Sequence, residues 1–274
     1  MKTYKIKEFA RNIGVTEKTL RYYEKFKIVE PSVDESNGYR SYNYRDAERI
    51  VASKRFSNME FSIKEISKLL NETTIEEVTE KFRIQSQNLE EKARRLNVIA
   101  GRMRELEEEL EWFRKSPNQG FLYQGKEWWF IRHVKDAEFV QDEKSLSIVR
   151  KMMDALPCSV KMMRLPLEPE KNNNLFWGLA IEPNYAEAMG IYFQAPMEKI
   201  AAAHCFYYPA VVTCKKERIL RGGKDTQRIW QCMKKELEKN HLSVTAAPYM
   251  IGSIDSFSGD IREKHFLYCV PVGD

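Results

Sequence analysis

Residues 16–27 read TEKTLRYYEKFK and combine cations, hydroxyl groups and adjacent tyrosines at a spacing suited to a helix. At about 100° per residue, Leu20 and Tyr23 share one side of that helix. The opposite face carries Lys18, Arg21, Tyr22 and Lys25. Lysine and arginine pair with phosphate groups, and a tyrosine hydroxyl adds a hydrogen bond. The pattern predicts a helix that binds a polyanion through this face, and the alternative is a solvated lysine-rich face without a ligand.

The flanking residues predict a helix-turn-helix. Apolar spacing favours a first helix over residues 6–12. Gly14 is expected to end it, and Thr16 is expected to cap the second helix. Pro31 is expected to stop the second helix. Two helices joined by a short glycine turn form the helix-turn-helix motif.

A hairpin and further helices are predicted next. Asn37 and Gly38 form a dipeptide typical of a hairpin turn. The tip of that hairpin carries Tyr39, Arg40, Tyr42 and Arg45. Such a hairpin can act as a wing that reaches phosphates. A third helix is expected over residues 46–58, and Ser62 with Glu65 forms a capping box for a fourth.

The positive charge of the chain is concentrated at its start. Residues 1–70 hold 15 Lys and Arg against 10 Asp and Glu, an excess equal to the net charge of +5 for all 274 residues. A basic N-terminal module favours a polyanionic partner. The start MKTYKIKEF lacks an apolar signal segment, and no apolar run reaches the roughly 20 residues of a membrane span. We therefore expect a cytoplasmic protein with no membrane partner.

Residues 75–113 show the strongest periodicity in the chain. Apolar residues alternate at steps of three and four, and only Gln85 and Lys92 interrupt the pattern. The positions are Ile75, Val78, Phe82, Leu89, Leu96, Ile99, Met103, Leu106, Leu110 and Phe113. A regular heptad seam predicts a helix that supercoils with another helix. Since the chain has no second helix of similar length, we expect a homodimer through residues 75–115; packing against the same chain is the alternative.

The residues after SPNQG (116–120) predict an α+β domain. Segments such as EWWFIRHV, LFWGLAIE, GIYFQA and HFLYCVPV are typical of strands. Two amphipathic helices, over residues 144–156 and 225–237, align at an offset of 81 residues. The alignment pairs Ile148 with Ile229, Val149 with Trp230, Met152 with Met233 and Leu156 with Leu237. This weak similarity favours a duplicated strand–helix–strand unit.

The five cysteines predict mostly buried thiols rather than a metal site. They are Cys158, Cys205, Cys214, Cys232 and Cys269, an odd count without a C-x-x-C pair. This composition is typical of a reducing compartment. A reactive or ligand-binding thiol is the alternative.

The first 70 residues resemble the winged helix-turn-helix of the MerR family of transcription regulators. The matching pieces are VTEKTLRYYEK, the wing tip GYRSY and the RD that begins the next helix. The resemblance implies a dimer, paired through an antiparallel coiled coil, on a pseudo-palindromic double-stranded promoter. It also implies activation by distorting promoter DNA for RNA polymerase. The residues it assigns to DNA are Thr16, Lys18, Thr19, Arg21, Tyr22, Lys25, Tyr39, Arg40 and Tyr42.

The C-terminal part is similar to the gyrase-inhibitor-like effector domain of multidrug-binding members, a pseudo-twofold pair of sheet–helix units around an aromatic cleft. This implies domains at 1–74 (DNA binding), 75–115 (dimerisation), 116–120 (linker) and 121–274 (effector binding). Tyr249 or Met250 stands where cation-binding relatives carry a glutamate, so we expect a bulky aromatic ligand, weakly charged or neutral, although a cation stays possible. Candidate ligand residues are Trp129, Trp177, Tyr192, Phe206, Tyr208, Tyr249 and Tyr268.

Other functions are less well supported by the residues. Metal sensing is disfavoured because no cysteine precedes Cys158, and no cofactor is expected. A small-molecule hydrolase could use Glu182, His204 and Tyr208, but their spacing indicates no acid–base pair. A thiol-based redox regulator could use Cys205, Cys214 or Cys269. The leading expectation is a non-enzymatic, ligand-responsive DNA-binding activator.

Overall fold

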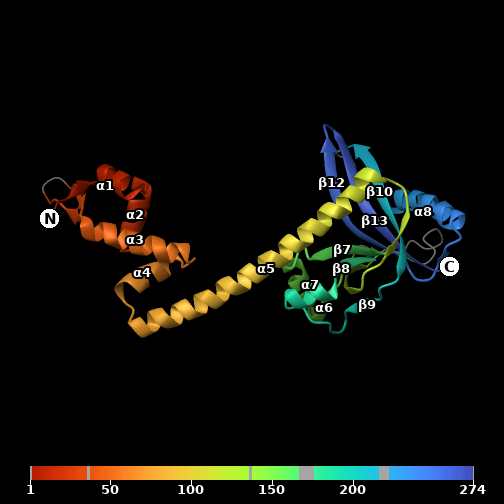
Figure 1. Ribbon diagram of the computed structural model, residues 1–274, viewed down its shortest axis with the longest axis horizontal. Coiled ribbons are helices and arrows are strands. Elements are labelled where there is room, and N and C mark those ends of the chain that lie inside the picture. Colours follow the sequence, from red (N-terminus) through yellow and green to blue (C-terminus); the bar gives the residue numbers. More distant parts are fainter. Residues whose placement is uncertain (1, 36–37, 136–137, 167–175, 216–221, 274) are drawn as a thin grey trace. The chain divides into compact units, whose positions relative to one another are not determined.

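The computed structural model describes residues 2–35, 38–135, 138–166, 176–215 and 222–273 (Figure 1). The chain divides into two compact units, Met1–Ala93 and Arg94–Asp274. Helix α5 (Ile75–Lys115) belongs to both, and its bounds match the predicted long helix. No helix among the described residues is long and apolar enough to cross a membrane.

The first unit contains four short helices and a small antiparallel sheet in the order β1-β3-β2. The helices are α1 (Ile6–Ile13), α2 (Glu17–Lys25), α3 (Tyr44–Asn58) and α4 (Ile63–Asn71). The strands are β1 (Tyr4–Lys5), β2 (Ser32–Val33) and β3 (Arg40–Tyr42). Asn37 lies outside the described residues, while β2 and β3 pair antiparallel with Val33 opposite Arg40.

The predicted helix-turn-helix is confirmed, with one correction at its end. Gly14 closes α1 in the left-handed conformation (φ 74°), and Thr16 caps α2. Pro31 does not stop α2, which ends at Lys25. Lys27 instead adopts φ 53°, and the Ile28 N–H donates to the Tyr23 carbonyl at 3.0 Å. This is a Schellman-type ending in which buried Ile28 supplies the apolar contact.

The starts of α3 and α4 are set by capping boxes. Helix α3 begins two residues before the prediction, because Asn43 caps it and Asp46 accepts a bond from the Asn43 N–H at 2.8 Å. The predicted box of Ser62 and Glu65 is confirmed at α4. These local bonds satisfy backbone donors that the first helical turn leaves open.

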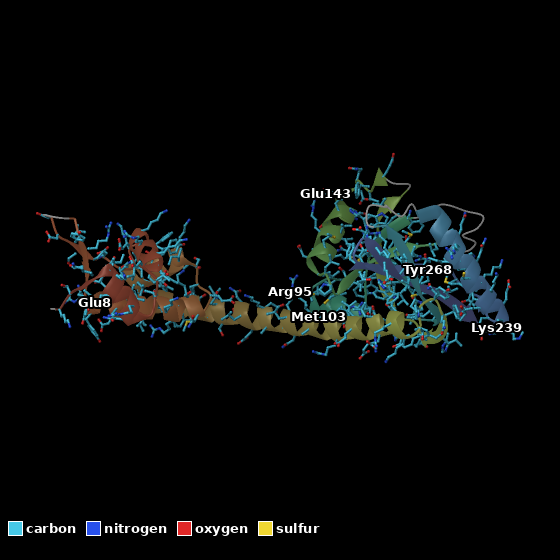
Figure 2. All side chains as sticks on the ribbon, turned by 90° about the horizontal axis from the view of Figure 1, so that it is seen from above. Glu8, Arg95, Met103, Glu143, Lys239 and Tyr268 are labelled. Carbon is cyan, nitrogen blue, oxygen red and sulfur yellow. The ribbon has the colours of Figure 1, made fainter. Side chains whose placement is uncertain are left out.

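The heptad seam of α5 divides into two lines of side chains. One line repeats every seven residues from Ile75 to Leu110, and most of it faces solvent: Ile75, Phe82, Leu96, Met103 and Leu110 are all exposed. The other line, which includes Val78, Ile99 and Phe113, packs against the cores of its own chain. Half of the seam is therefore largely exposed in the protomer, although Phe82 also contacts the rings of Phe56 and Phe61. Figure 2 labels Met103 on the α5 ribbon.

The second unit is built on an antiparallel sheet in the order β4-β10-β13-β12-β7-β8-β5-β6, with β9 paired to β5 and β11 to β13. The first strands are β4 (Phe121–Gln124), β5 (Trp128–Lys135), β6 (Glu138–Phe139), β7 (Ser159–Arg164) and β8 (Phe176–Ile181). The others are β9 (Glu198–Ile200), β10 (His204–Lys215), β11 (Ser243–Val244), β12 (Tyr249–Ser258) and β13 (Ile261–Gly273). The helices are α6 (Glu143–Asp154), α7 (Pro183–Ala188) and α8 (Gly222–Lys239).

Opposite faces of this sheet carry separate cores. Alternation along β10 sends Phe206 and Tyr208 into a core with α8, and Tyr207 into a core on the other face. A third core lies under α6 and α7. Helix α5 adds Ile99 to the α6 core and Trp112 to the core that holds Tyr207.

The strand order is symmetric about the β7–β12 pair, since β8 and β5 follow on one side and β13 and β10 on the other. Met152 and Met233, one of the helix pairs aligned from the sequence, are both fully buried. Leu156 does not match Leu237: it lies beyond the end of α6 and is exposed. The segment GIYFQA is also not a strand, since no residue of 190–195 pairs with the sheet.

Candidate functional site

The solvent face of α2 carries the residues predicted for polyanion binding. Lys18, Arg21 and Lys25 are exposed, and the Tyr22 side chain is 48% exposed. Phe26 holds the Tyr22 ring in an edge contact with centroids 5.0 Å apart. Leu20 and Tyr23 are buried in the core of the unit. The predicted division between Tyr22 and Tyr23 is therefore seen in the burial of the two rings. We call Lys18, Arg21, Tyr22 and Lys25 the basic face.

The start of α2 adds hydroxyl and backbone groups to the basic face. The Thr16 Oγ1 accepts a hydrogen bond from the Thr19 N–H at 3.0 Å and lies 2.8 Å from the Thr19 hydroxyl. Anions are stabilised at helix N-termini by open N–H groups and the helix dipole. The first turn of α2 can thus support a phosphate beside the cations of the basic face.

The wing corrects one predicted contact residue. Tyr39 and Arg40 are exposed, but Tyr42 is fully buried and stacks on Phe9 with centroids 5.0 Å apart. Arg40 and Tyr42 are two residues apart and lie on the same side of β3, where both contact Glu24, but only Tyr42 reaches the core. Its hydroxyl donates to the Glu24 carboxylate, and burial together with this bond raises the pKa of Tyr42. Tyr42 is therefore a core residue and not a surface contact.

Glu24 and Arg49 join α2 to the wing strand and to α3, and sequence reasoning did not single them out. The Arg40 Nε donates to Glu24 Oε2 at 2.9 Å, so one carboxylate on α2 binds both Arg40 and Tyr42 of the wing strand. The Arg49 Nη2 donates to the Lys27 carbonyl at 3.2 Å, which links α3 to the end of α2. The only signal in the sequence was that Glu24 is an acidic residue on a helix rich in cations.

The predicted ligand residues do not form one site in the sheet unit. Phe206, Tyr208 and Tyr268 lie in the α8 core, and Tyr249 lies in the core on the opposite face. Trp129 packs beside the α6 core, and Trp177 contacts His133 with ring centroids 5.4 Å apart. Tyr192 is 71% exposed in a segment that is not a strand. The sheet separates these aromatic residues because neighbouring strand positions face opposite sides.

A different group of rings gathers where α5 ends. Trp112 lies 5.4 Å from Phe121, 5.3 Å from Tyr123 and 6.0 Å from Tyr207, measured between ring centroids. Tyr123 and Tyr207 are themselves 5.2 Å apart. These separations are typical of edge-to-face aromatic contacts. We call Trp112, Phe121, Tyr123 and Tyr207 the aromatic cluster, which sequence reasoning missed because its members lie on three different elements.

Two buried hydrogen-bond donors lie in the core beside the aromatic cluster. Within the described chain, the Trp128 Nε1 has no hydrogen-bond partner, and the Tyr249 hydroxyl has only the weak sulfur acceptors of Cys205 and Cys269 beside it. Both residues are nearly fully buried. Burial, followed by the nearby Cys269 and Tyr207, raises the pKa of Tyr249, so its hydroxyl keeps its proton. A buried donor without a partner is costly, and a ligand acceptor can remove that cost.

The cysteines in this core are poor redox candidates. Cys205 and Cys269 are buried, and burial raises the pKa of each thiol. The thiolate is the reactive form, so raised pKa values make both sulfurs unreactive at neutral pH. The side chain of Cys214 lies outside the described residues. Among the described cysteines, only Cys232 is exposed.

A network of buried charges fastens α5 to the sheet unit. The Arg102 side chain is 1% exposed, and its Nη1 donates to Glu109 at 2.8 Å and to Glu105 at 3.0 Å. Lys126 Nζ lies 3.1 Å from Glu105 and 2.8 Å from Glu182. The Tyr185 hydroxyl donates to Glu105 at 2.5 Å. We call these six residues the charge network.

The pKa values of the two glutamates that bind Lys126 shift in opposite directions. Burial raises the pKa of Glu182 and outweighs the bond from Lys126. Burial also acts on Glu105, but bonds from Tyr185, Lys126 and Arg102 outweigh it and lower its pKa. The difference follows from exposure, since the Glu105 side chain is 39% exposed and that of Glu182 is 11%.

The proposed hydrolase residues have separate surroundings. Glu182 binds Lys126 in the charge network, His204 is exposed at the start of β10, and Tyr208 is buried under α8. No described contact joins them into an acid–base arrangement. Over the described ranges, no group of three or more His, Cys, Asp or Glu side chains could hold a metal ion.

Comparisons with known proteins match the first unit. The MerR HTH family regulatory protein model covers residues 4–73. An uncharacterized HTH-type transcriptional regulator of Pseudomonas aeruginosa is 37% identical over 65 residues, 24% of this chain and 49% of that protein. The HTH-type transcriptional regulator ZntR homolog of Haemophilus influenzae is 30% identical over 98 residues, 35% of this chain and 73% of that protein.

This chain spans about half the length of the first curated relatives that it matches. Among solved structures, the EcmrR–DNA complex is 18% identical and covers 97% of this chain and 99% of that one, with a TM-score of 0.34.

Proposed function

The chain belongs to the MerR family of helix-turn-helix regulatory proteins, and we propose that it is a ligand-responsive transcription activator. In this proposal residues 1–74 bind promoter DNA, 75–115 form the dimer, 116–120 connect, and 121–274 bind an effector. The observation that carries it is the basic face on α2, exposed while Leu20 and Tyr23 anchor the opposite side.

For DNA binding, the basic face would lie in the major groove and the wing would reach the flanking backbone. Thr16 and Thr19 supply hydroxyls at the first turn of α2. Tyr39 and Arg40 supply the wing contacts, and Glu24 holds Arg40 in place. Cations in these positions act mainly on phosphates, which set register and orientation.

The partner of the dimer would cover the solvent-facing line of the α5 seam. Ile75, Leu96 and Met103 repeat at multiples of seven residues and are 71%, 54% and 61% exposed. A heptad line of this kind is expected to pack into a second, equivalent helix. A twofold dimer would present two basic faces, as a pseudo-palindromic promoter requires, and the complex would act on RNA polymerase.

The aromatic cluster and the two buried donors beside it support an effector site on the same face of the sheet. Trp128 and Tyr249 offer N–H and O–H groups in a largely apolar core, and Glu109 lies near Tyr207 and Cys269. These groups favour a bulky aromatic effector that carries a hydrogen-bond acceptor, neutral or weakly charged. The symmetric strand order supports a domain of two related sheet–helix halves.

The charge network supports a route from the effector domain to α5. Arg102, Glu105 and Glu109 lie on α5, whereas Lys126, Glu182 and Tyr185 come from the sheet unit. A ligand that moves β5 or α7 would act on these bonds. Since α5 continues into the first unit, such a shift would reach the DNA-binding helices through the backbone.

Footprinting on an inverted repeat between promoter elements, with the wild type and an Arg21→Ala variant, tests DNA recognition. We expect protection by the wild type and about tenfold weaker binding by the variant, because a charged hydrogen bond to phosphate is lost. Equal protection by both proteins would contradict the assignment of the basic face.

Titration with a panel of neutral and cationic aromatic dyes tests the effector site. Trp112 lies within the aromatic cluster, so binding should quench tryptophan fluorescence in the wild type and less in a Trp112→Phe variant. A panel that leaves the fluorescence unchanged would refute a drug-like effector without affecting the assignment of DNA binding.

A further inference from the structure

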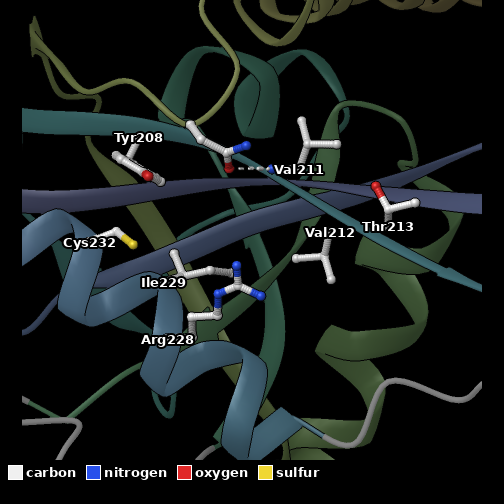
Figure 3. A pocket seen from close by; sticks show the side chains of 8 residues that line it. Tyr208, Val211, Val212, Thr213, Arg228, Ile229 and Cys232 are labelled. Atoms are coloured by element: carbon white, nitrogen blue, oxygen red, sulfur yellow. Dashed lines mark hydrogen bonds between the residues drawn. The ribbon is translucent and has the colours of Figure 1, made fainter.

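A pocket of about 500 Å³ opens between α8 and β10, in the sheet unit (Figure 3). The pocket lies on the face of the sheet that α8 covers. The aromatic cluster belongs to the core on the opposite face. Figure 3 shows the Tyr208 hydroxyl, the Cys232 sulfur and the Arg228 guanidinium turned toward the same space. A volume of this size is typical of sites for small organic ligands.

Tyr208 lines this pocket. The residue is 3% exposed, and no hydrogen bond described in the structure engages its hydroxyl. Burial, followed by Cys232 and Glu236, raises the pKa of Tyr208 to about 12, so the group is a proton donor at neutral pH. A phenol hydroxyl that keeps its proton can donate a hydrogen bond to an acceptor oxygen of a ligand.

Arg228 supplies a positive charge at the same pocket. It stands one helical turn before Cys232 on α8, so both side chains lie on one face of the helix. In the described part of the chain, no carboxylate pairs with Arg228, and no Asp or Glu lines the pocket. Glu236 lies near Tyr208, but its Oε2 accepts the Gly120 N–H at 2.9 Å.

Asn118 completes the donor set and comes from the turn that follows α5. Its N–H donates to the Pro209 carbonyl at 2.9 Å, and its Oδ1 accepts the Val211 N–H at 3.0 Å. These two bonds fix the side chain and leave its NH2 group available as a donor. Val212 and Ile229 add apolar surface next to these polar groups.

We propose that this pocket is a second ligand site, for a small organic anion with an apolar body, such as an aromatic carboxylate. The carboxylate would pair with Arg228 and accept hydrogen bonds from Tyr208 and Asn118, and the ring would rest on Val212 and Ile229. Because Asn118 directly follows the dimerisation helix, the bound anion would also brace the end of α5. This site is independent of the aromatic effector proposed for the opposite face.

Two probes with the same ring and opposite charge test the site on the full chain. 2-Naphthoate and 2-naphthylmethylammonium are titrated separately by calorimetry. We expect the naphthoate to bind at least about tenfold more tightly, and Arg228→Gln to weaken it by about tenfold. The matched control is Lys235→Gln, an exposed cation of α8 outside the pocket, which should leave the affinity unchanged. Equal affinity for both probes, or an unaffected Arg228→Gln, would overturn the proposal.

Protection of Cys232 locates the bound anion independently. Among the described cysteines it is the exposed one, so iodoacetamide should modify its peptide faster than those of Cys158, Cys205 and Cys269. We expect saturating naphthoate to slow the alkylation of Cys232 by several-fold, and Tyr208→Phe to reduce that protection without lowering the melting temperature. Naphthoate binding that leaves the alkylation rate unchanged would place the anion elsewhere and refute the site.

Discussion

In the first unit Lys18, Arg21 and Lys25 stand in solvent on α2, whereas in the second unit Arg102 and Lys126 are enclosed among three glutamates. Among the described residues, no ion pair engages the cations of α2. Those of the charge network are already paired and hold α5 against the sheet unit. In the proposed function the same residue types would bind phosphates in one unit and couple α5 to the sheet in the other, and burial makes the difference.

The aromatic residues show the same contrast. Tyr22 and Tyr39 are exposed on the DNA-binding unit. Tyr207, Tyr208 and Tyr249 are buried in the sheet unit, and which face of the sheet each one joins depends on strand alternation. In the proposed function, recognition by the first unit would depend on one helix, and recognition by the second would depend on the whole sheet.

Breaking the charge network should have the largest effect. Arg102→Met leaves the largely buried Glu109 without its cation and Glu105 with Lys126 alone, and we expect the free energy of unfolding of the sheet unit to fall by about 3 kcal/mol. All five tryptophans lie in that unit, so denaturation followed by tryptophan fluorescence measures it alone.

The control for Arg102 is Arg114→Met on the same helix. Arg114 pairs with Glu111 three residues away but is 72% exposed, so its loss should leave the free energy of unfolding nearly unchanged. If both variants lose a similar free energy of unfolding, burial of the charge network does not contribute to stability.

Separating the two tyrosines of α2 tests the division between packing and binding. Tyr23→Ala should lower the stability of the first unit by about 3 kcal/mol, because a buried ring leaves a cavity. Tyr22→Phe should leave the melting temperature unchanged and weaken DNA binding by several-fold, through loss of one hydrogen bond. Calorimetric melting and a DNA titration measure the two effects, and the division is wrong if the two variants behave alike.

The wing offers a smaller test of the same kind. Tyr42→Phe removes the bond to Glu24 within the core and should cost about 1 kcal/mol of stability. Arg40→Ala should instead weaken DNA binding equally across sequences and reduce the slope of binding against salt by about one. An Arg40→Ala protein with wild-type affinity and slope would exclude Arg40 as a phosphate contact.

The pH dependence of the charge network is the smallest expected effect. The pKa of Glu105 is lower in the folded state than in the unfolded state. Glu105 therefore stabilises the fold above its unfolded-state pKa, and this stabilisation is lost as pH falls. The raised pKa of Glu182 acts on stability in the opposite direction. Its contribution to stability is present below the pKa of the unfolded state and is lost as pH rises through the pKa of the folded state. In the wild type the contributions of Glu105 and Glu182 to stability partly cancel between pH 6 and pH 4.

Glu182→Gln removes the opposing contribution. Its stability should therefore fall more steeply than that of the wild type between pH 6 and pH 4, by less than about 1 kcal/mol. Denaturation at each pH measures the difference. A variant whose stability is less sensitive to acid than the wild type would reverse the assigned sign.

The sequence alone determined the features whose causes are local. Gly14, Thr16 and the box of Ser62 with Glu65 act within a few residues of the chain, so their roles were predicted before any fold was known. The two faces of α2 and the heptad seam of α5 follow from helical periodicity in the same way. These local patterns located the basic face, although they misplaced the end of α2 by relying on Pro31.

Only the tertiary structure decided the features that join distant residues. Tyr42 reaches Glu24 across 18 positions, Tyr185 reaches Glu105 across 80, and Asn118 reaches Val211 across 93. The predicted ligand residues were separated because register determines which side of the sheet each ring faces, and a shift of one position reverses it. Periodicity indicates that a side chain is buried, but it cannot indicate which neighbours it meets there, because sheet pairing and helix docking bring those neighbours from elsewhere in the chain.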